Sequence, residues 1–189
     1  MTSTNLPTVV IVPGLRDHMP EHWQTLLAEQ LQAQGRAVQI VPQIDHDKAL
    51  RGARVANLER VVSGIEGPIV LVAHSMGCCI TVHWAQQTTC EVQGALLAAP
   101  ADLDTPLPAG YSDPQTLAAN GWTPLPRARL PFPSIVVGSR NDPIGGFEQV
   151  HALAQAWGSR FVDGGDIGHL SPLDGYGNWP KAAELLREL

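Results

Sequence analysis

The sequence is poor in positive charge and contains no cluster of it. Its 189 residues include 12 Lys and Arg against 18 Asp and Glu, which gives a net charge of −6. Nucleic acids and anionic membranes attract proteins through patches rich in lysine and arginine. The composition therefore argues against a nucleic-acid or membrane partner.

Long apolar runs are missing too, and cysteine is scarce. No run approaches the ~20 residues that a helix needs to cross a bilayer. The opening MTSTNLPT lacks the charged start and apolar core of a signal peptide. Cys78 and Cys79 are adjacent and Cys90 stands alone, and an odd count without framework spacing is typical of reduced thiols. These absences predict a cytoplasmic protein, and nothing in the residues indicates an oligomeric state.

What the sequence does contain is an alternation of short apolar runs and helical patterns. Strands separated by helices pair in parallel through right-handed crossovers, and runs that are apolar on both faces indicate a sheet covered by helices on both sides. We therefore predict a single α/β domain over residues 1–189 with a doubly wound, mostly parallel sheet. The expected strands are 8–12, 37–41, 69–72, 93–98, 134–137 and 160–163. The expected helices are 21–34, 49–63, 76–88, 147–157 and 180–189.

One long connection interrupts this alternation of strands and helices. Residues 101–131 contain six prolines, and Asp113-Pro114 is typical of an N-cap followed by proline in the first turn of a short helix. A connection of this length is usually functional or disordered. Its apolar residues include Leu117, Trp122 and Leu125. Two interpretations stay open, an ordered flap beside a pocket and a surface loop that packs its own apolar residues.

The stretch VAHSMG places Ser75 between an expected strand and an expected helix. A serine hydroxyl is a weak nucleophile, so it needs a base, an oriented base and donors for an oxyanion. A sharp strand-to-helix turn with small flanking residues, G-x-S-x-G, lifts the hydroxyl above the sheet. Here Ala73 replaces the first glycine and Gly77 is the second. The sequence therefore predicts that Ser75 is a nucleophile, with a capping serine as the alternative.

An acid and a base should follow the nucleophile in the order Asp or Glu, then His. Asp142 follows the fifth expected strand, and His169 lies in a glycine-rich loop after the sixth. The carboxyl ends of parallel strands meet at one edge of a sheet, where ligands bind in such folds. We therefore expect His169 to take the serine proton and Asp142 to orient the imidazole. The alternative acids, each less well placed, are Asp102, Asp163 and Asp166.

Two backbone N–H groups should bind the oxyanion. One belongs to the residue after the nucleophile, Met76, and the other to the loop after the first strand, where Leu15 is our candidate.

A metal site is not expected. His18 and His22 have the spacing of ligands on a helix, but Pro20 lies between them and no third ligand is evident. Cys78 and Cys79 lie in an apolar helical pattern, which indicates core residues rather than nucleophiles.

Four longer motifs together resemble a known family. They are VVIVPGL…EHWQ, LVAHSMGC…HWA, PLPRARLPFPSIVVGSRNDP and WGS…GHLSPLDGYGNWP, and they run from Thr8 nearly to the C-terminus. They resemble the small serine hydrolases typified by retinoblastoma-binding protein 9, within the α/β-hydrolase superfamily. The resemblance implies a compact fold without a cap domain, a six-stranded sheet of order 2-1-3-4-5-6, and a triad that falls on Ser75, Asp142 and His169.

The sequence departs from the family pattern at two positions. Ala73 replaces a glycine in the strand-to-helix turn that holds Ser75, which we call the elbow, and Ile144 stands where relatives often carry an aromatic residue. Nothing in the residues marks a surface for retinoblastoma protein, so that partner is not transferred.

The expected function is a serine hydrolase, with a carboxylesterase acting on small acyl esters through an acyl-enzyme as the first hypothesis. Serine chemistry supplies its own nucleophile, so we expect no cofactor. Besides Leu15, the expected substrate contacts are Trp122, Ile144, Tyr176 and Trp179. An amidase or peptidase would use the same triad, and a non-catalytic protein could use the same cleft to bind a ligand or another protein. Both alternatives stay open.

Overall fold

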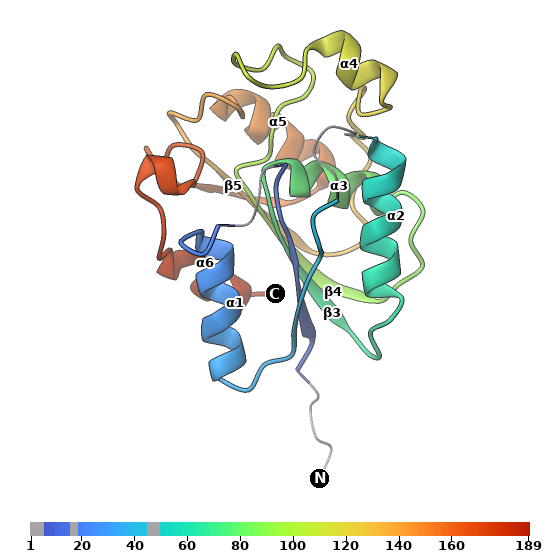
Figure 1. The fold of residues 1–189 in the computed structure, drawn as a ribbon, viewed down its shortest axis with the longest axis vertical. Coiled ribbons are helices and arrows are strands. Elements are labelled where there is room, and N and C mark those ends of the chain that lie inside the picture. The colour runs from blue at the N-terminus through green and yellow to red at the C-terminus, as the bar shows by residue number, and fades with distance from the viewer. Residues whose placement is uncertain (1–5, 16–18, 45–49) are drawn as a thin grey trace.

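Six parallel strands form one sheet in the part of the chain that the structure describes. The structure is a computed structural model and describes residues 6–15, 19–44 and 50–189. The strand order is β2-β1-β3-β4-β5-β6, and every neighbouring pair is parallel (Figure 1). This confirms the order that the family resemblance implies. The strands are β1 (Thr8–Val12), β2 (Val38–Ile40), β3 (Ile69–His74), β4 (Val92–Ala98), β5 (Ser134–Gly138) and β6 (Arg160–Asp163).

The helices lie where periodicity predicts them, but several are shorter than expected. The helix expected over 76–88 ends at Trp84, because the following N–H groups bond in turns: Gln86 N donates to the His83 carbonyl and Gln87 N to that of Trp84. Helix ends often tighten in this way. The helices are α1 (Trp23–Ala33), α2 (Arg51–Val62), α3 (Met76–Trp84), α4 (Pro114–Ala119), α5 (Phe147–Trp157) and α6 (Pro180–Leu186), with a 3₁₀ turn η1 (Pro172–Asp174).

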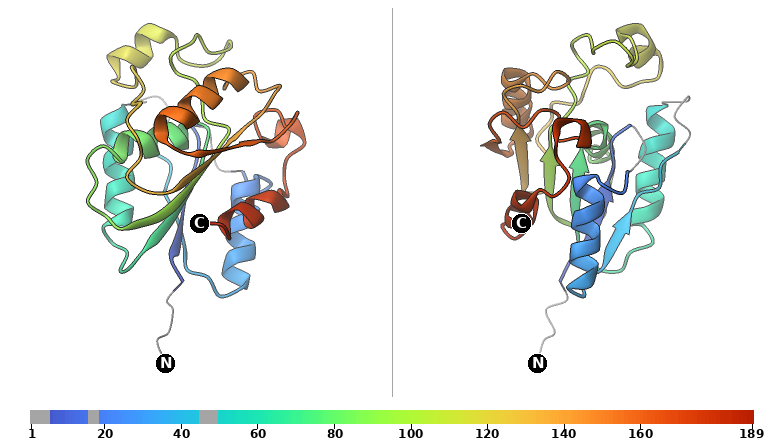
Figure 2. Two further views of the ribbon diagram at one scale, coloured as in Figure 1. Left: turned by 180° about the vertical axis from the view of Figure 1, so that it is seen from behind. Right: turned by 60° about the vertical axis from the view of Figure 1, so that its left-hand side comes forward.

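The helices pack in two layers on the faces of the sheet. Successive strand residues point to opposite faces, so Val9 and Ile11 of β1 join the core under α1 and α6, whereas Val10 joins the core under α2, α3 and α5. Both views of Figure 2 show these layers, with α4 lying beyond the end of the sheet and apart from them. The doubly wound α/β class predicted from the sequence is therefore confirmed.

The 101–131 segment is folded against the second of these cores. Asp113 caps α4 by accepting a hydrogen bond from Thr116 N at 2.9 Å, and Pro114 opens the helix, as the sequence predicts. The expected apolar residues are buried in the core with α2 and α3 rather than in a separate cluster. They are Leu117, Trp122 and Leu125.

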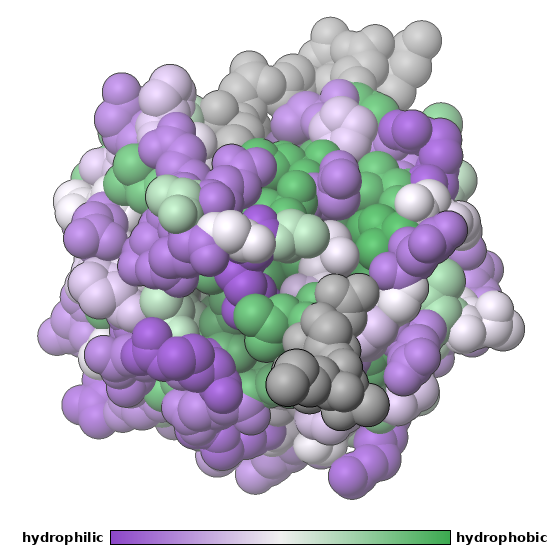
Figure 3. All heavy atoms as spheres, turned by 90° about the horizontal axis from the view of Figure 1, so that it is seen from below, coloured by the Kyte–Doolittle hydropathy of each residue, from purple (hydrophilic) through white to green (hydrophobic). Residues whose placement is uncertain are grey.

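Among the described residues, no helix is both long and apolar enough to cross a bilayer. Figure 3 shows one face of the molecule, on which hydrophilic residues dominate the outline and apolar residues are exposed nearer the middle.

His83 of α3 fastens the 101–131 segment to the rest of the fold. Its Nε2–H donates to the Trp122 carbonyl at 3.0 Å, and the side chain is almost fully buried. Burial disfavours the imidazolium and lowers the pKa of His83; the bond to the carbonyl opposes this change, and the charge of Arg51 adds to it. The folded protein therefore keeps this ring neutral at pH values where an unfolded histidine is already protonated.

The lowered pKa of His83 predicts that the protein loses stability in mild acid. As the pH falls below about 6.5, His83 becomes protonated in the unfolded chain but stays neutral in the folded chain. The unfolded state then binds more protons than the folded state, so the free energy of unfolding falls. His83→Gln keeps an N–H donor but does not titrate. We expect the variant to lose less stability than the wild type between about pH 7 and pH 5, measured by chemical denaturation at several pH values. Equal losses in the two proteins would contradict the assignment.

Candidate active site

Ser75 lies between β3 and α3, in a backbone conformation that a serine rarely adopts. Its φ of 54° and ψ of −123° lie outside the usual regions, and such strain costs on the order of 1–3 kcal/mol. The Ser75 N–H donates to the Ala98 carbonyl of β4 at 3.1 Å, which holds the turn to the sheet. The loop after β1 passes close by: a Cβ added to Gly14 would lie 3.2 Å from the Ser75 Cβ.

The side chains of Ser75, His169 and Asp142 form a continuous chain of hydrogen bonds. His169 Nε2 lies 2.7 Å from Ser75 Oγ, and His169 Nδ1 lies 2.8 Å from Asp142 Oδ2 and 3.0 Å from Oδ1. A carboxylate only accepts, so Nδ1 carries the proton and Nε2 is left to accept from the serine hydroxyl. The arrangement can therefore remove a proton from Ser75.

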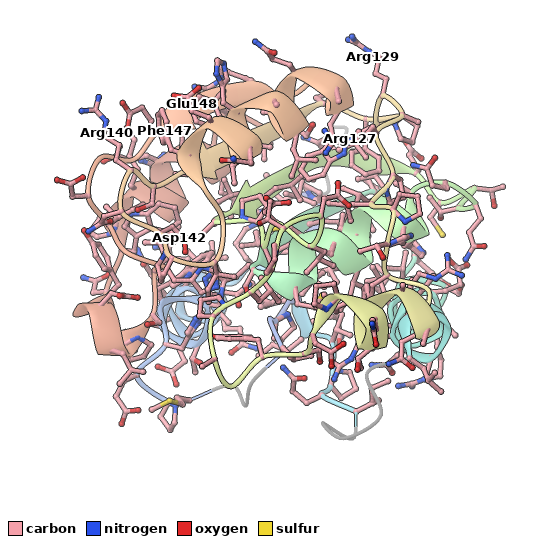
Figure 4. The ribbon with its side chains drawn as sticks, turned by 90° about the horizontal axis from the view of Figure 1, so that it is seen from above. Arg127, Arg129, Arg140, Asp142, Phe147 and Glu148 are labelled. Carbon is pink, nitrogen blue, oxygen red and sulfur yellow. The ribbon has the colours of Figure 1, made fainter. Side chains whose placement is uncertain are left out.

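Asp142 is the acid that reaches the imidazole, and the alternatives do not. Its side chain is 1% exposed, and its Oδ1 also accepts from Ile144 N at 2.8 Å. Asp102 instead accepts from the Thr105 hydroxyl at 2.8 Å. Asp163 is an exposed partner of Arg140, which points out of the molecule in Figure 4 while Asp142 lies inward.

Three side chains that the sequence analysis missed hold the backbone of His169 and of Gly168 before it. His74, the last residue of β3, donates from Nε2 to the His169 carbonyl at 2.8 Å. Asp174 Oδ2 accepts from His169 N at 3.0 Å, and Asn141 Oδ1 accepts from Gly168 N at 2.7 Å. His74 and Asn141 directly precede Ser75 and Asp142 in the chain, and this adjacency is the signal that could have found them.

Gly168 shows why this loop is rich in glycine. Its φ is +57°, and a Cβ there would lie 2.5 Å from the Asp174 carboxyl group. Only glycine therefore lets the chain bring His169 down to Ser75 while Asp174 binds the next N–H.

A hollow opens beside Ser75 and has about 300 Å³ of empty space, which includes solvent at its mouth. Residues of the elbow and the 101–131 segment contribute most of its lining. We call it the Ser75 hollow, and its lining residues are Leu15, Ser75, Met76, Ala101, Leu107, Tyr111, Ser112, Leu117 and Ile144.

Ile144 lines the hollow as expected, but the three aromatic substrate contacts predicted from the sequence lie elsewhere. Trp122 is 0% exposed and fills the core under α4, so that prediction is wrong. Tyr176 and Trp179 pack against the core under α1 and α6, where Trp179 lies edge-on to Trp23 with ring centroids 4.9 Å apart. Their bulk serves packing rather than the hollow.

The two candidate oxyanion donors both border the hollow beside Ser75. Met76 is the first residue of α3, so its N–H is one of those left unpaired within the helix at an N-terminus. Leu15 follows Gly14, which lies close to Ser75, and Leu15 and Met76 are both among the residues that line the hollow.

The weaker candidates of the sequence analysis have other roles. His22 caps α1, since its Nδ1 accepts from Gln24 N at 3.2 Å, whereas His18 lies outside the described residues. Cys78 and Cys79 are fully buried, and burial raises the pKa of both thiols well above its ordinary value. Within the described ranges, no three His, Cys, Asp or Glu side chains gather closely enough to hold a metal ion.

Comparisons with known proteins identify a family and similar folds for this chain. A family model described as "Serine hydrolase" matches residues 9–188. A YdeN-like hydrolase from Pectobacterium atrosepticum is 29% identical over 96% of this chain and 89% of its own, with a TM-score of 0.80. The ydeN gene product of B. subtilis (20% identity, 96% and 97% coverage, TM-score 0.74) is similar in fold. So is a thermophilic esterase from Thermogutta terrifontis (19% identity, 96% and 88% coverage, TM-score 0.65). A search of curated proteins gave no match.

Proposed function

We propose that this chain, which belongs to the serine hydrolase family, is a carboxylesterase that acts on small acyl esters through Ser75, His169 and Asp142. The observation that carries the proposal is the 2.7 Å distance from Ser75 Oγ to His169 Nε2, with the other ring nitrogen bonded to a buried carboxylate. The complete set of three side chains is the reason to prefer hydrolysis over a binding role without catalysis.

In the first half of the reaction, Ser75 Oγ attacks the carbonyl carbon of the ester while its proton passes to His169 Nε2. The carbonyl oxygen becomes an oxyanion, which the N–H groups of Met76 and Leu15 stabilise. The carbon–oxygen bond to the alcohol then breaks, and Nε2–H gives its proton to the departing oxygen. The product is an alcohol and an acyl-Ser75 ester.

In the second half, water takes the place of the alcohol. His169 Nε2 accepts a proton as the water oxygen attacks the acyl carbon, and it returns the proton to Ser75 Oγ as the carboxylic acid leaves. Asp142 keeps the imidazole in the correct tautomer and stabilises the imidazolium that forms twice in each cycle. Because Asp142 also accepts from the backbone N–H of Ile144, its carboxylate stays fixed throughout.

A fluorophosphonate probe tests the assignment of the nucleophile. The probe reacts with an activated serine hydroxyl to form a phosphonyl-serine and releases fluoride. We expect the wild type to be labelled at Ser75 and Ser75→Ala to remain unlabelled, as read by intact mass and peptide mapping. A matched control is Ser112→Ala, which removes a hydroxyl from the same hollow and should leave labelling intact. Equal labelling of wild type and Ser75→Ala would remove Ser75 from the mechanism.

A further inference from the structure

The Ser75 hollow lies on one side of the nucleophile only. Of the described residues that line it, none comes from the His169 loop and the turn after it, residues 164–179. The lining comes instead from the loop after β1, the turn at Ser75, the 101–131 segment and the loop after β5. The base and the hollow therefore flank Ser75 on different sides.

This asymmetry decides which part of an ester enters the hollow. The departing alcohol oxygen must take its proton from His169 Nε2, so the alcohol has to lie on the histidine side. The carbonyl oxygen must face the N–H groups of Met76 and Leu15, which border the hollow. The remaining substituent of the carbonyl carbon is the acyl chain, and the hollow is the space left for it.

We propose that the Ser75 hollow is an acyl pocket for short, neutral, apolar acyl groups, closed at its outer wall by Leu107 and Tyr111, while the alcohol is left without a pocket of its own. The inference rests on the proposed function and adds to it the part of the substrate that is selected. The enzyme would then discriminate strongly between acyl groups and weakly between alcohols.

The composition and size of the hollow support this substrate class. The lining formed by the described residues contains no charged side chain, so a carboxylate or ammonium on the acyl chain would be desolvated there without a partner. The empty space of about 300 Å³ includes solvent at the mouth, so the enclosed part of the hollow is smaller than this figure. Acetyl, propionyl and butyryl groups suit such a space better than long fatty chains.

The 101–131 segment limits the length of the chain. Leu107 and Tyr111 line the hollow and are half-buried, and both pack against the core that holds Trp122 and Leu117. Because the segment is anchored by those buried residues, its wall is fixed in place. Leu107 is the side chain to change, since its partial exposure lets a substitution alter the pocket without opening the core.

The test compares two series of esters. With p-nitrophenol as a constant leaving group, we expect kcat/KM of the wild type to rise about fourfold for each added methylene from acetate to butyrate, then to fall for octanoate and decanoate. With butyrate as a constant acyl group, ethyl, butyl and hexyl esters should agree within about threefold. Dependence on the alcohol as steep as that on the acyl group would overturn the inference. Absence of turnover on every ester would instead contradict the proposed function.

Variants of Leu107 test whether this side chain sets the limit on the length of the acyl chain. Leu107→Ala should raise the octanoate-to-butyrate ratio of kcat/KM at least about tenfold, and Leu107→Trp should lower it by a similar factor. Leu173→Ala is the matched control, because Leu173 is 89% exposed on η1 and outside the hollow; its ratio should stay that of the wild type. Thermal unfolding of each variant verifies that it is folded. Unchanged ratios in both folded Leu107 variants would overturn the inference.

Discussion

Replacing Ser75 or His169 with alanine is expected to lower kcat/KM for p-nitrophenyl butyrate by at least about a thousandfold. Without the hydroxyl no acyl-enzyme can form, and without the imidazole the hydroxyl keeps its proton at neutral pH. Because the two groups act in one step, separated by 2.7 Å, the loss in the double variant should be close to that of either single variant. The measurement is steady-state hydrolysis at saturating and subsaturating ester.

The control for the histidine is His151→Ala. His151 lies in α5 and packs against Phe161, with ring centroids 4.6 Å apart and ring planes tilted by 38°, and it does not line the Ser75 hollow, so this variant should keep the activity of the wild type. If His169→Ala retained activity within about tenfold of wild type, or if the losses of the two single variants simply multiplied in the double variant, the shared proton-transfer step would be contradicted.

Gly77→Ala should destabilise the protein by at least about 3 kcal/mol, although alanine is the better helix former. Gly77 is the second residue of α3, and a Cβ there would lie 2.2 Å from the Val12 carbonyl oxygen and 2.7 Å from that of Pro13. These oxygens belong to the end of β1 and its loop, which cannot move aside without shifting the strand or Gly14 beside Ser75. Chemical denaturation measures the difference in the free energy of unfolding.

Gly52→Ala provides a comparison at the same place in another helix. Gly52 is the second residue of α2, is exposed, and has no atom of the described residues within 4 Å of an added Cβ. Alanine there should be neutral or stabilise by up to about 1 kcal/mol, because it restricts the unfolded chain and suits the helix. Similar effects at both positions would show that helix propensity, rather than the close approach to β1, determines the result.

Much of the fold could be predicted from the sequence because burial leaves a periodic signal. The apolar run from Ile69 to Val72 is a strand, and it is apolar throughout because both faces of the central sheet are covered. Asp113 and Pro114 marked α4 because capping chemistry is local. The helix ends were predicted less well, since the turns after Trp84 depend on bonds that periodicity does not encode.

The candidate site also has a part that the sequence predicts and a part that it does not. Ser75, Asp142 and His169 could be picked out because each follows its own strand, and the carboxyl ends of neighbouring parallel strands meet. The walls of the hollow could not, because they depend on how the 101–131 segment folds back over the elbow. Trp122 illustrates the difficulty: a large aromatic residue in that segment suits a pocket or a core equally well in sequence, and only its 0% exposure separates the two.

Because β6 is an edge strand of the sheet, the proposed activity is expected to be sensitive to destabilising conditions. Within the described sheet β6 pairs only with β5, yet the chain that follows it brings His169 to a serine presented by β3, near the centre. Marginal strands open more readily than central ones. Transient detachment of this edge would loosen the loop that carries the base, although His74 of β3 still holds the His169 carbonyl. Hydrolysis would therefore weaken under mild stress before the protein as a whole unfolds.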